Sequence, residues 1–138
     1  MSAFVLDCSV AISWLFEDEA TSDTDALLER LQEERAIVPN LWRLEIGNVL
    51  SQAERKSRIP SSELARFLDL ISRLPIDVDA ETDSRALHDI LALARAEILT
   101  TYDAAYLELA MRRGIPLATH DRALIRAADS VAVRCLPA

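Results

Sequence analysis

The stretch "AFVLD" at residues 3–7, continued by "VAISWLF" at residues 10–16, sets a pattern that recurs along the chain. The first part is a short apolar run that ends in an acid, as a buried strand does. The second part has the spacing of a short helix. The chain therefore begins as a strand followed by a helix.

Four further apolar runs predict strands, and helical patterns separate them. The strands are expected at 36–39, 75–80, 115–119 and 131–136, and the helices at 22–35, 41–53, 60–74, 82–96, 100–113 and 122–128. Gly114 is a typical residue to end the helix before it. Strands that alternate with helices favour right-handed crossovers. We expect an α/β fold whose central, mostly parallel five-stranded sheet is flanked by helices on both faces.

Length and composition indicate one compact domain over residues 1–138. The chain is 51% hydrophobic with two Gly and five Pro, which is unlike a disordered or fibrous protein. No apolar run is long enough to span a membrane, and the N-terminus lacks the basic segment of a secretory signal, so we expect a cytoplasmic protein. Cys8 and Cys135 lie in apolar segments and are given no chemical role.

The charge balance constrains the partners. A formal net charge of −8 argues against a surface that binds nucleic acid by neutralising many phosphates at once. All but one of the 15 basic residues are Arg, with a cluster at 52–58 and a pair at Arg112 and Arg113. These are weak candidates for phosphate contacts, because solvated helix faces explain each of them better.

Acids follow the predicted strands at one edge of the sheet. They are Asp7 after the first strand, Glu45 in the helix after the second, Asp121 after the fourth, and Asp103 within "TTYDAAYLELA" at 100–110. In parallel sheets, ligands bind outside the carboxyl ends of the strands. Carboxylates gathered without His or Cys suit a hard cation, Mg²⁺ or Mn²⁺.

Each acid also has a structural explanation of its own. Asp7 and Asp121 could cap the helices that follow them, and Asp103 could form a capping box with Thr100. Glu45 lies on or beside an apolar helix stripe, so we expect a positive side chain, an Arg, to face it if it is buried.

Four segments of the chain resemble the acidic motifs of the PIN domain family, in the family's order, and are closest to the VapC-type ribonuclease toxins. They are "VLDCSV" (5–10), "PNLWRLEIGNVL" (39–50), "LTTYDAAYLELA" (99–110) and "PLATHDRAL" (116–124). The resemblance covers nearly the whole chain. It implies a metal-dependent endoribonuclease that uses one or two Mg²⁺ or Mn²⁺ ions, with Asp7, Glu45, Asp103 and Asp121 as the catalytic and metal-binding residues.

The resemblance also implies supporting residues and partners. Ser9, Asn48 and Thr119 match family positions that would hold carboxylates or waters by hydrogen bonds. The implied partners are an RNA substrate, a VapB-like antitoxin packed on the helices near 22–56, and a second copy of the chain through residues 62–74. Cys8 departs from the usual pattern, and its side chain should point away from the site if the strand alternation continues. His120 is a weaker candidate for a general base.

Two other classes of function remain open. A PIN-like domain without activity could serve as a binding module or scaffold. An aspartyl-phosphate enzyme also places an acid after its first strand, but the phosphatase type needs a second Asp where Ser9 stands. Both aspartyl-phosphate folds need a Lys late in the chain, and the one Lys here is Lys56.

Overall fold

The sheet is entirely parallel, with five strands. The structure is a computed structural model, and residues 2–16 and 18–137 of the protein are described in it. The strands are β1 (Ala3–Leu6), β2 (Arg35–Val38), β3 (Ile76–Val78), β4 (Leu117–Ala118) and β5 (Cys135–Leu136). Their order is β3-β2-β1-β4-β5, and every pair of neighbours is parallel. The predicted α/β fold with a five-stranded parallel sheet is confirmed.

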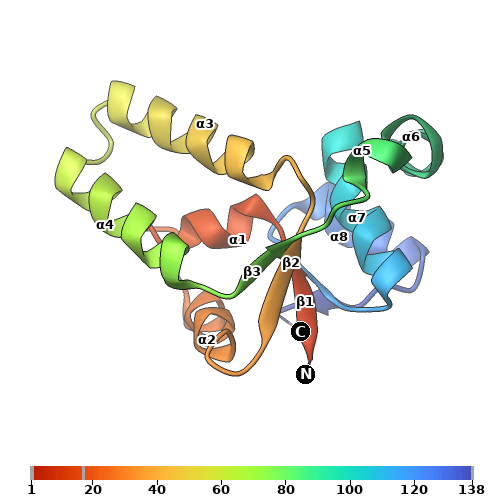
Figure 1. Ribbon diagram of the computed structural model, residues 1–138, viewed down its shortest axis with the longest axis horizontal. Coiled ribbons are helices and arrows are strands. Elements are labelled where there is room, and N and C mark those ends of the chain that lie inside the picture. Colours follow the sequence, from red (N-terminus) through yellow and green to blue (C-terminus); the bar gives the residue numbers. More distant parts are fainter. Residues whose placement is uncertain (1, 17, 138) are drawn as a thin grey trace.

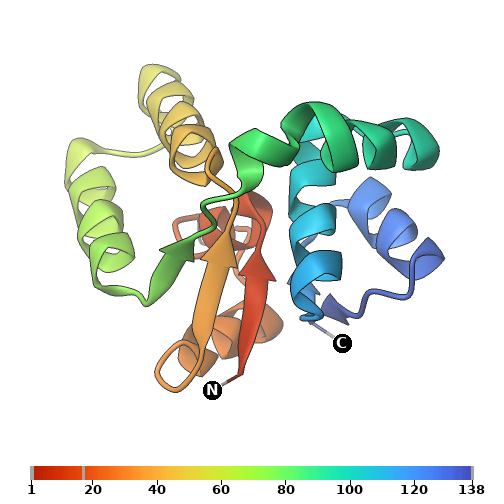
Figure 2. The ribbon, with the colours of Figure 1, turned by 45° about the vertical axis from the view of Figure 1, so that its right-hand side comes forward.

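The strand order reverses direction at β1. The chain moves outward from β1 to β3 in its first half, returns to the other side of β1 at β4, and then moves outward to β5. Because such crossovers are right-handed, the two halves place their helices on opposite faces of the sheet, as Figures 1 and 2 show. The point where the order reverses lies between the carboxyl ends of β1 and β4, and ligands bind at such points in open α/β sheets.

The helices of the first half cover one face. They are α1 (Cys8–Ser13), α2 (Ser22–Arg30), α3 (Trp42–Arg55) and α4 (Ser61–Arg73). Helix α2 ends earlier than predicted, because Leu31 begins a turn that leads into β2. Helices α3 and α4 form a hairpin that extends away from the sheet (Figure 1), and Phe67 is the one fully buried residue of α4.

The helices of the second half cover the other face. They are α5 (Thr82–Arg85), the single π-helical turn η1 (Ala86–Ile90), α6 (Leu91–Glu97), α7 (Thr101–Arg113) and α8 (Arg122–Ser130). The predicted helix at 82–96 is therefore interrupted by a π-helical turn. Gly114 ends α7 in the left-handed conformation, as predicted. Ile98 ends α6 in the same conformation, which is unusual for a β-branched side chain.

One hydrophobic core unites the two faces. The alternation of β1 places Phe4 and Leu6 on one side of the sheet and Val5 on the other, and all three are completely buried. Helix α7 packs against β1 and β4 along a face that includes Tyr106, Leu107 and Leu109. In the described part of the chain, no helix is both long enough and apolar enough to cross a membrane.

Candidate active site

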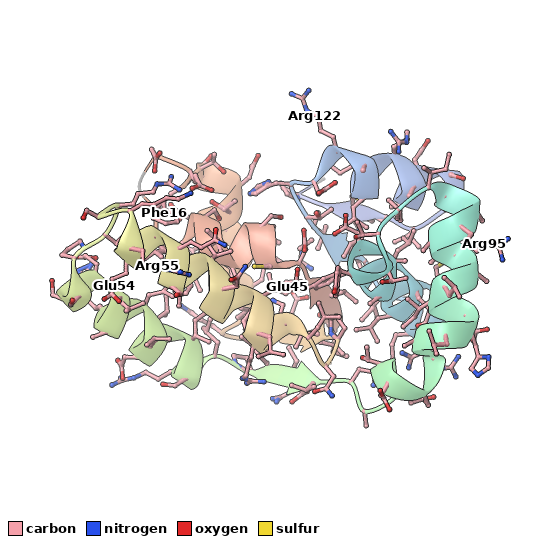
Figure 3. The ribbon with its side chains drawn as sticks, turned by 90° about the horizontal axis from the view of Figure 1, so that it is seen from above. Phe16, Glu45, Glu54, Arg55, Arg95 and Arg122 are labelled. Carbon is pink, nitrogen blue, oxygen red and sulfur yellow. The ribbon has the colours of Figure 1, made fainter. Side chains whose placement is uncertain are left out.

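The fold brings the four predicted acids to one edge of the sheet. Asp7 immediately follows β1 and precedes α1, Glu45 lies in the first turn of α3, Asp103 lies in the first turn of α7, and Asp121 precedes α8. Figure 3 looks down on this edge and shows Glu45 near the middle, between the two halves of the molecule. Asp7, Glu45 and Asp121 belong to segments that follow strands, so they lie at the carboxyl ends of the strands. Helix α7 leads into β4, so the first turn of α7, which contains Asp103, lies at this end of the sheet too.

Asp7 is held by two hydroxyl groups, both of which bind the same oxygen. Ser9 donates to Oδ2 of Asp7 over 2.8 Å, and Thr119 donates to the same atom over 2.7 Å. Asp7 is 6% exposed and Thr119 is 2% exposed. The two hydroxyls therefore fix the orientation of this carboxylate and leave its other oxygen, Oδ1, free of both.

The same hydroxyls connect β1 to the segment after β4. Oγ1 of Thr119 also accepts the backbone N–H of Asp121 over 3.0 Å, and Oγ of Ser9 accepts the backbone N–H of His120 over 3.1 Å. Asp121 caps α8, since its Oδ1 accepts the N–H groups of Ala123 and Leu124. The structural explanation for Asp121 is thus correct, and it accounts for only one of the two carboxylate oxygens.

Asp103 is not explained by capping. Thr100 accepts the backbone N–H of Asp103 over 3.1 Å, which makes Thr100 the cap of α7. The reciprocal bond from the Thr100 backbone N–H to the Asp103 carboxylate, which would complete a capping box, is not formed, whereas Thr21 and Thr24 do form one at α2. The carboxylate of Asp103 is therefore available for another role.

The prediction that an Arg faces Glu45 is wrong. Oε1 of Glu45 accepts a hydrogen bond from the hydroxyl of Tyr106, a completely buried residue of α7. No Arg, Lys or His within the described residues forms an ion pair with any of the four acids. Tyr106 was not predicted from the sequence as part of the site, although its position one turn after Asp103 places both residues on one face of α7.

Burial and neighbouring acids raise the pKa of Asp7, Glu45 and Asp103. The pKa of Asp103 rises to about 6, mainly because the carboxyl is partly buried and then because the negative charges of Asp121 and Asp7 oppose its ionisation. Burial also raises the pKa of Asp7 and of Glu45, and hydrogen bonds from Thr119, Ser9 and Tyr106 partly oppose the effect. These mutual effects show that the acids form one electrostatic centre.

Cys8 lies closer to this centre than its predicted orientation allows. The strand ends at Leu6 and α1 begins at Cys8, so the strand alternation does not continue to this residue. Burial and then the charges of Glu45 and Asp7 raise the pKa of the Cys8 thiol to about 12. A neutral thiol at this position adds no charge to the site.

The donor set fits a hard divalent cation. Groups within the described residues bind one carboxylate oxygen of each of Asp7, Glu45 and Asp121, and hydrogen-bonded ligands are presented to an ion in this way. Over residues 2–16 and 18–137, no three acidic, His or Cys side chains already form a coordination shell. Mutual repulsion separates carboxylates, and Mg²⁺ commonly completes its shell with water and substrate phosphate.

Other candidate residues lie outside this centre. Asn48 is exposed one turn after Glu45, and its supporting role remains a prediction. Arg112 and Arg113 both bind Asp79, which is 2% exposed, and their role as phosphate contacts remains a prediction. Arg112 also binds Glu108, at 2.8 Å. Their charges are used within the protein.

The fold and the site together define a doubly wound α/β domain with an acidic centre at the point where its strand order reverses. Residues 4–130 match the PIN domain family, and the chain belongs to this family. The predicted resemblance is confirmed.

The chain is similar to a protein named as a VapC ribonuclease and to several solved structures. It is 27% identical to Ribonuclease VapC3 of Pyrobaculum aerophilum over 120 residues, which are 87% of this chain and 90% of that protein. The crystal structure of PAE2754 from the same organism has a TM-score of 0.70 at 22% identity, over 98% of this chain and 84% of that one. VapBC2 from Rickettsia felis, solved with a DNA fragment from the promoter, has a TM-score of 0.63 at 13% identity over 96% of each chain. A toxin-antitoxin complex from Klebsiella pneumoniae has a TM-score of 0.57 at 15% identity, over 86% of each chain.

Proposed function

We propose that this PIN domain is a Mg²⁺- or Mn²⁺-dependent endoribonuclease. One observation carries the proposal: four carboxylates from four separate segments meet at the reversal point of the sheet without a basic partner among the described residues. Asp7 is buried and the other three acids are partly buried, and carboxylates in such surroundings are costly without a positive partner, so their presence favours a chemical role. The similarity to Ribonuclease VapC3 supports RNA as the substrate.

Asp7, Glu45, Asp103 and Asp121 would hold one or two ions. The ions would lower the pKa of a water molecule and offset the charge of the phosphodiester group. The hydroxyls of Ser9 and Thr119 keep Asp7 in a fixed orientation, so its free oxygen stays in place while RNA binds. Asp121 is fixed by the backbone of α8 in the same way.

A cleavage assay on RNA tests this proposal. We expect the purified protein to cut single-stranded RNA with Mn²⁺ or Mg²⁺ and to lose the activity in excess chelator. An Asp7→Asn variant, prepared in parallel, controls for a contaminating nuclease and should be inactive. Cleavage that persists in chelator, or in the variant, would contradict the proposal.

The structure gives the alternatives less support. An inactive binding module would place no demand on carboxylates, yet three of the four acids are oriented by hydrogen bonds. An aspartyl-phosphate enzyme would need Lys56 near Asp7. Lys56 is exposed at the far end of α3, about 16 Å along the helix from Glu45.

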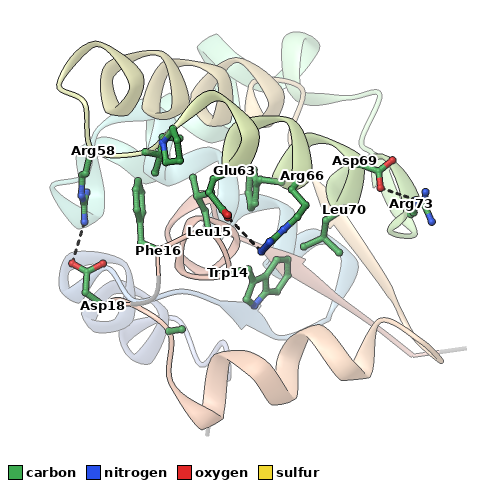
Figure 4. Close-up of a pocket in the computed structure, with 14 residues that line it drawn as sticks. Trp14, Leu15, Phe16, Asp18, Arg58, Glu63, Arg66, Asp69, Leu70 and Arg73 are labelled. Atoms are coloured by element: carbon green, nitrogen blue, oxygen red, sulfur yellow. Dashed lines mark hydrogen bonds and ion pairs between the residues drawn. The ribbon is translucent and has the colours of Figure 1, made fainter.

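We further propose that the chain is the toxin of a toxin-antitoxin pair, and that a groove at the far end of α1 binds the antitoxin. This groove has a volume of about 1250 Å³ and is shown in Figure 4. Its apolar residues include Trp14, Leu15, Phe16 and Leu70, and the charged residues at its border include Arg58, Arg66 and Asp69. An amphipathic helix with charges beside its apolar stripe would fit such a surface. The chain leaving it could extend along α1 and direct a basic side chain at the acids.

The groove lies beyond the helices at 22–56 that the sequence favoured. Leu44 is the one large apolar residue in that range that is strongly exposed, at 79%. We expect Leu70→Glu to weaken antitoxin binding at least tenfold, measured by titration calorimetry, without loss of RNA cleavage by the free toxin. Equal affinity for wild type and variant would place the antitoxin elsewhere.

The opposite side of α4 is our proposed dimer contact. Leu68 is 50% exposed and is not among the residues that line the groove. Leu68→Glu should therefore shift the sedimentation of the free protein from dimer to monomer while leaving antitoxin affinity unchanged. A wild-type protein that sediments as a monomer at micromolar concentration would refute the dimer.

That the protein is cytoplasmic and cleaves RNA there remains a prediction.

A further inference from the structure

Tyr106 is a buried tyrosine whose polar atom points at the acidic centre. It lies on α7 one turn after Asp103, and none of its surface is exposed to solvent. Its hydroxyl donates to Oε1 of Glu45, a residue of α3 that lies 61 positions earlier in the chain. The bond therefore links the two halves of the molecule across the site.

The hydroxyl has no other partner in the described part of the chain. The aromatic ring packs in the main hydrophobic core with β1 and β4, so core packing explains the ring and leaves the oxygen unexplained. A Phe would fill the same space without the requirement for a hydrogen-bond partner. The oxygen thus points to a role at Glu45.

Among the three acids whose carboxylates are oriented by hydrogen bonds, Glu45 has the least support. Asp7 is held by Ser9 and Thr119, and Asp121 is held by the amides of α8, whereas Glu45 has three rotatable bonds and one hydrogen bond, the bond from Tyr106. Tyr106 occupies Oε1, so the hydrogen bond limits the rotation of the carboxylate and leaves Oε2 as the oxygen that could bind an ion. Hydrogen bonds of this kind commonly change metal affinity by about 10- to 100-fold.

We propose that Tyr106 is a positioning residue that holds Glu45 in the orientation needed for ion binding. The inference rests on the proposed metal-dependent function, and it adds a residue from the hydrophobic core to the site. Tyr106 contacts neither ion nor RNA in this role; it acts through Glu45.

The first test measures Mn²⁺ binding to the protein without RNA by titration calorimetry. Tyr106→Phe should raise the dissociation constant at least about tenfold. Tyr102→Phe is the matched control, because Tyr102 lies one turn earlier on the same helix and is 63% exposed, so its affinity should equal that of the wild type.

A double-variant cycle distinguishes positioning from general damage to the fold. In a Glu45→Ala background, Tyr106→Phe should leave the dissociation constant unchanged, because the residue through which Tyr106 acts is gone. A merely structural role would weaken binding in both backgrounds and would overturn the inference. Equal binding by wild type and Tyr106→Phe would overturn it too, whereas a wild type that binds no Mn²⁺ would overturn the proposed function first.

A spectroscopic measurement keeps the test valid if Tyr106→Phe does not fold. The chain has two tyrosines, so Tyr102→Phe leaves Tyr106 as the only one. Mn²⁺ should change the tyrosine absorption of this variant, because the ion competes for the electrons of Glu45 and weakens its bond with Tyr106. An unchanged tyrosine spectrum at saturating Mn²⁺ would refute the contact between Tyr106 and the binding site.

Discussion

Helix α7 takes part in two groups of acids that differ in one respect. In its first turn, Asp103 lies near other carboxylates and forms no ion pair with a basic side chain of residues 2–16 or 18–137, and its pKa rises to about 6. Near its last turn, Arg112 binds Asp79 and Glu108, and hydrogen bonds from Arg112 lower the pKa of Asp79. Both groups contain buried acids. The Asp79 group contains Arg112 and Arg113, and the Asp103 group contains no Arg among the described residues. This difference separates acids that stabilise the fold from acids available for chemistry.

The largest expected difference between the groups is in RNA cleavage. Asp103→Asn keeps the size of the side chain and removes the charge that would bind an ion, so cleavage should fall by more than about 100-fold. Asp79→Asn should cleave at close to the wild-type rate per folded molecule. The measurement is the initial rate of RNA cleavage at saturating Mn²⁺, below the melting temperature of each variant, with circular dichroism to establish the folded fraction. The reverse order of activities would show that the two groups have been assigned the wrong roles.

Stability should respond in the opposite sense. Asp79→Asn leaves Arg112 and Arg113 without their buried partner and should lower the free energy of unfolding by about 3 kcal/mol, or the melting temperature by roughly 10 °C. Asp77→Asn is the matched control, because Asp77 lies two residues earlier and is also bound by an Arg, Arg35, at 2.6 Å. That pair is 44% and 49% exposed, so solvent screens it and its loss should cost much less than the loss of Asp79. Equal losses from the two variants in thermal melts would refute a structural role for the Asp79 cluster.

The sequence predicted the acidic centre better than the arginine cluster, for a physical reason. Asp7, Glu45 and Asp121 follow strands, and parallel strands bring their carboxyl ends to one edge, so topology alone gathers them. The pairing of Arg112 with Asp79 depends on the packing of α7 against the segment after β3, which no local pattern specifies. The same limit applies to Tyr106, whose spacing fits the core equally well with or without a hydroxyl partner.

The continuous helix predicted at 82–96 was wrong in its middle. The predicted helix at 82–96 contains the π-helical turn η1, whose hydrogen bonds have no clear sequence signal.

Glu45 was expected beside an Arg because buried charge needs a partner, and the chain supplies the phenol of Tyr106 instead. Hydrogen bonding to a neutral donor satisfies the same requirement.

Divalent ions should sharpen the contrast between the two groups. Mn²⁺ at about 100 times its dissociation constant should stabilise the wild type by about 2.7 kcal/mol, which raises the melting temperature by several degrees. Asp79→Asn should show the same rise from its lower starting point, and Asp103→Asn a much smaller one. Thermal melts with Mn²⁺ and with chelator, at equal ionic strength, measure this change in melting temperature. A wild-type melt that does not respond to Mn²⁺ would contradict the ion site.

The smallest expected effect is the pH dependence of stability in metal-free protein. The Asp103 carboxyl has a pKa of about 6 in the folded protein, and a carboxyl in an unfolded chain has a pKa of about 4. Between these values the folded protein binds more protons than the unfolded chain, so the free energy of unfolding decreases as the pH rises through this window. Asp103→Asn removes this titration and the repulsion that accompanies it. In metal-free melts the free energy of unfolding of the variant should therefore exceed that of the wild type by about 1 kcal/mol at pH 7, and this excess should disappear near pH 4.

The pKa of Asp79 is lowered on folding, so the stability that Asp79→Asn loses should be fully lost above about pH 4, and the loss should shrink only below that pH. Melting temperatures of the three proteins at several pH values between about 3 and 7 would show these opposite trends if one group is repulsive and the other paired. Parallel curves for both variants would mean that the two ends of α7 do not differ in this way.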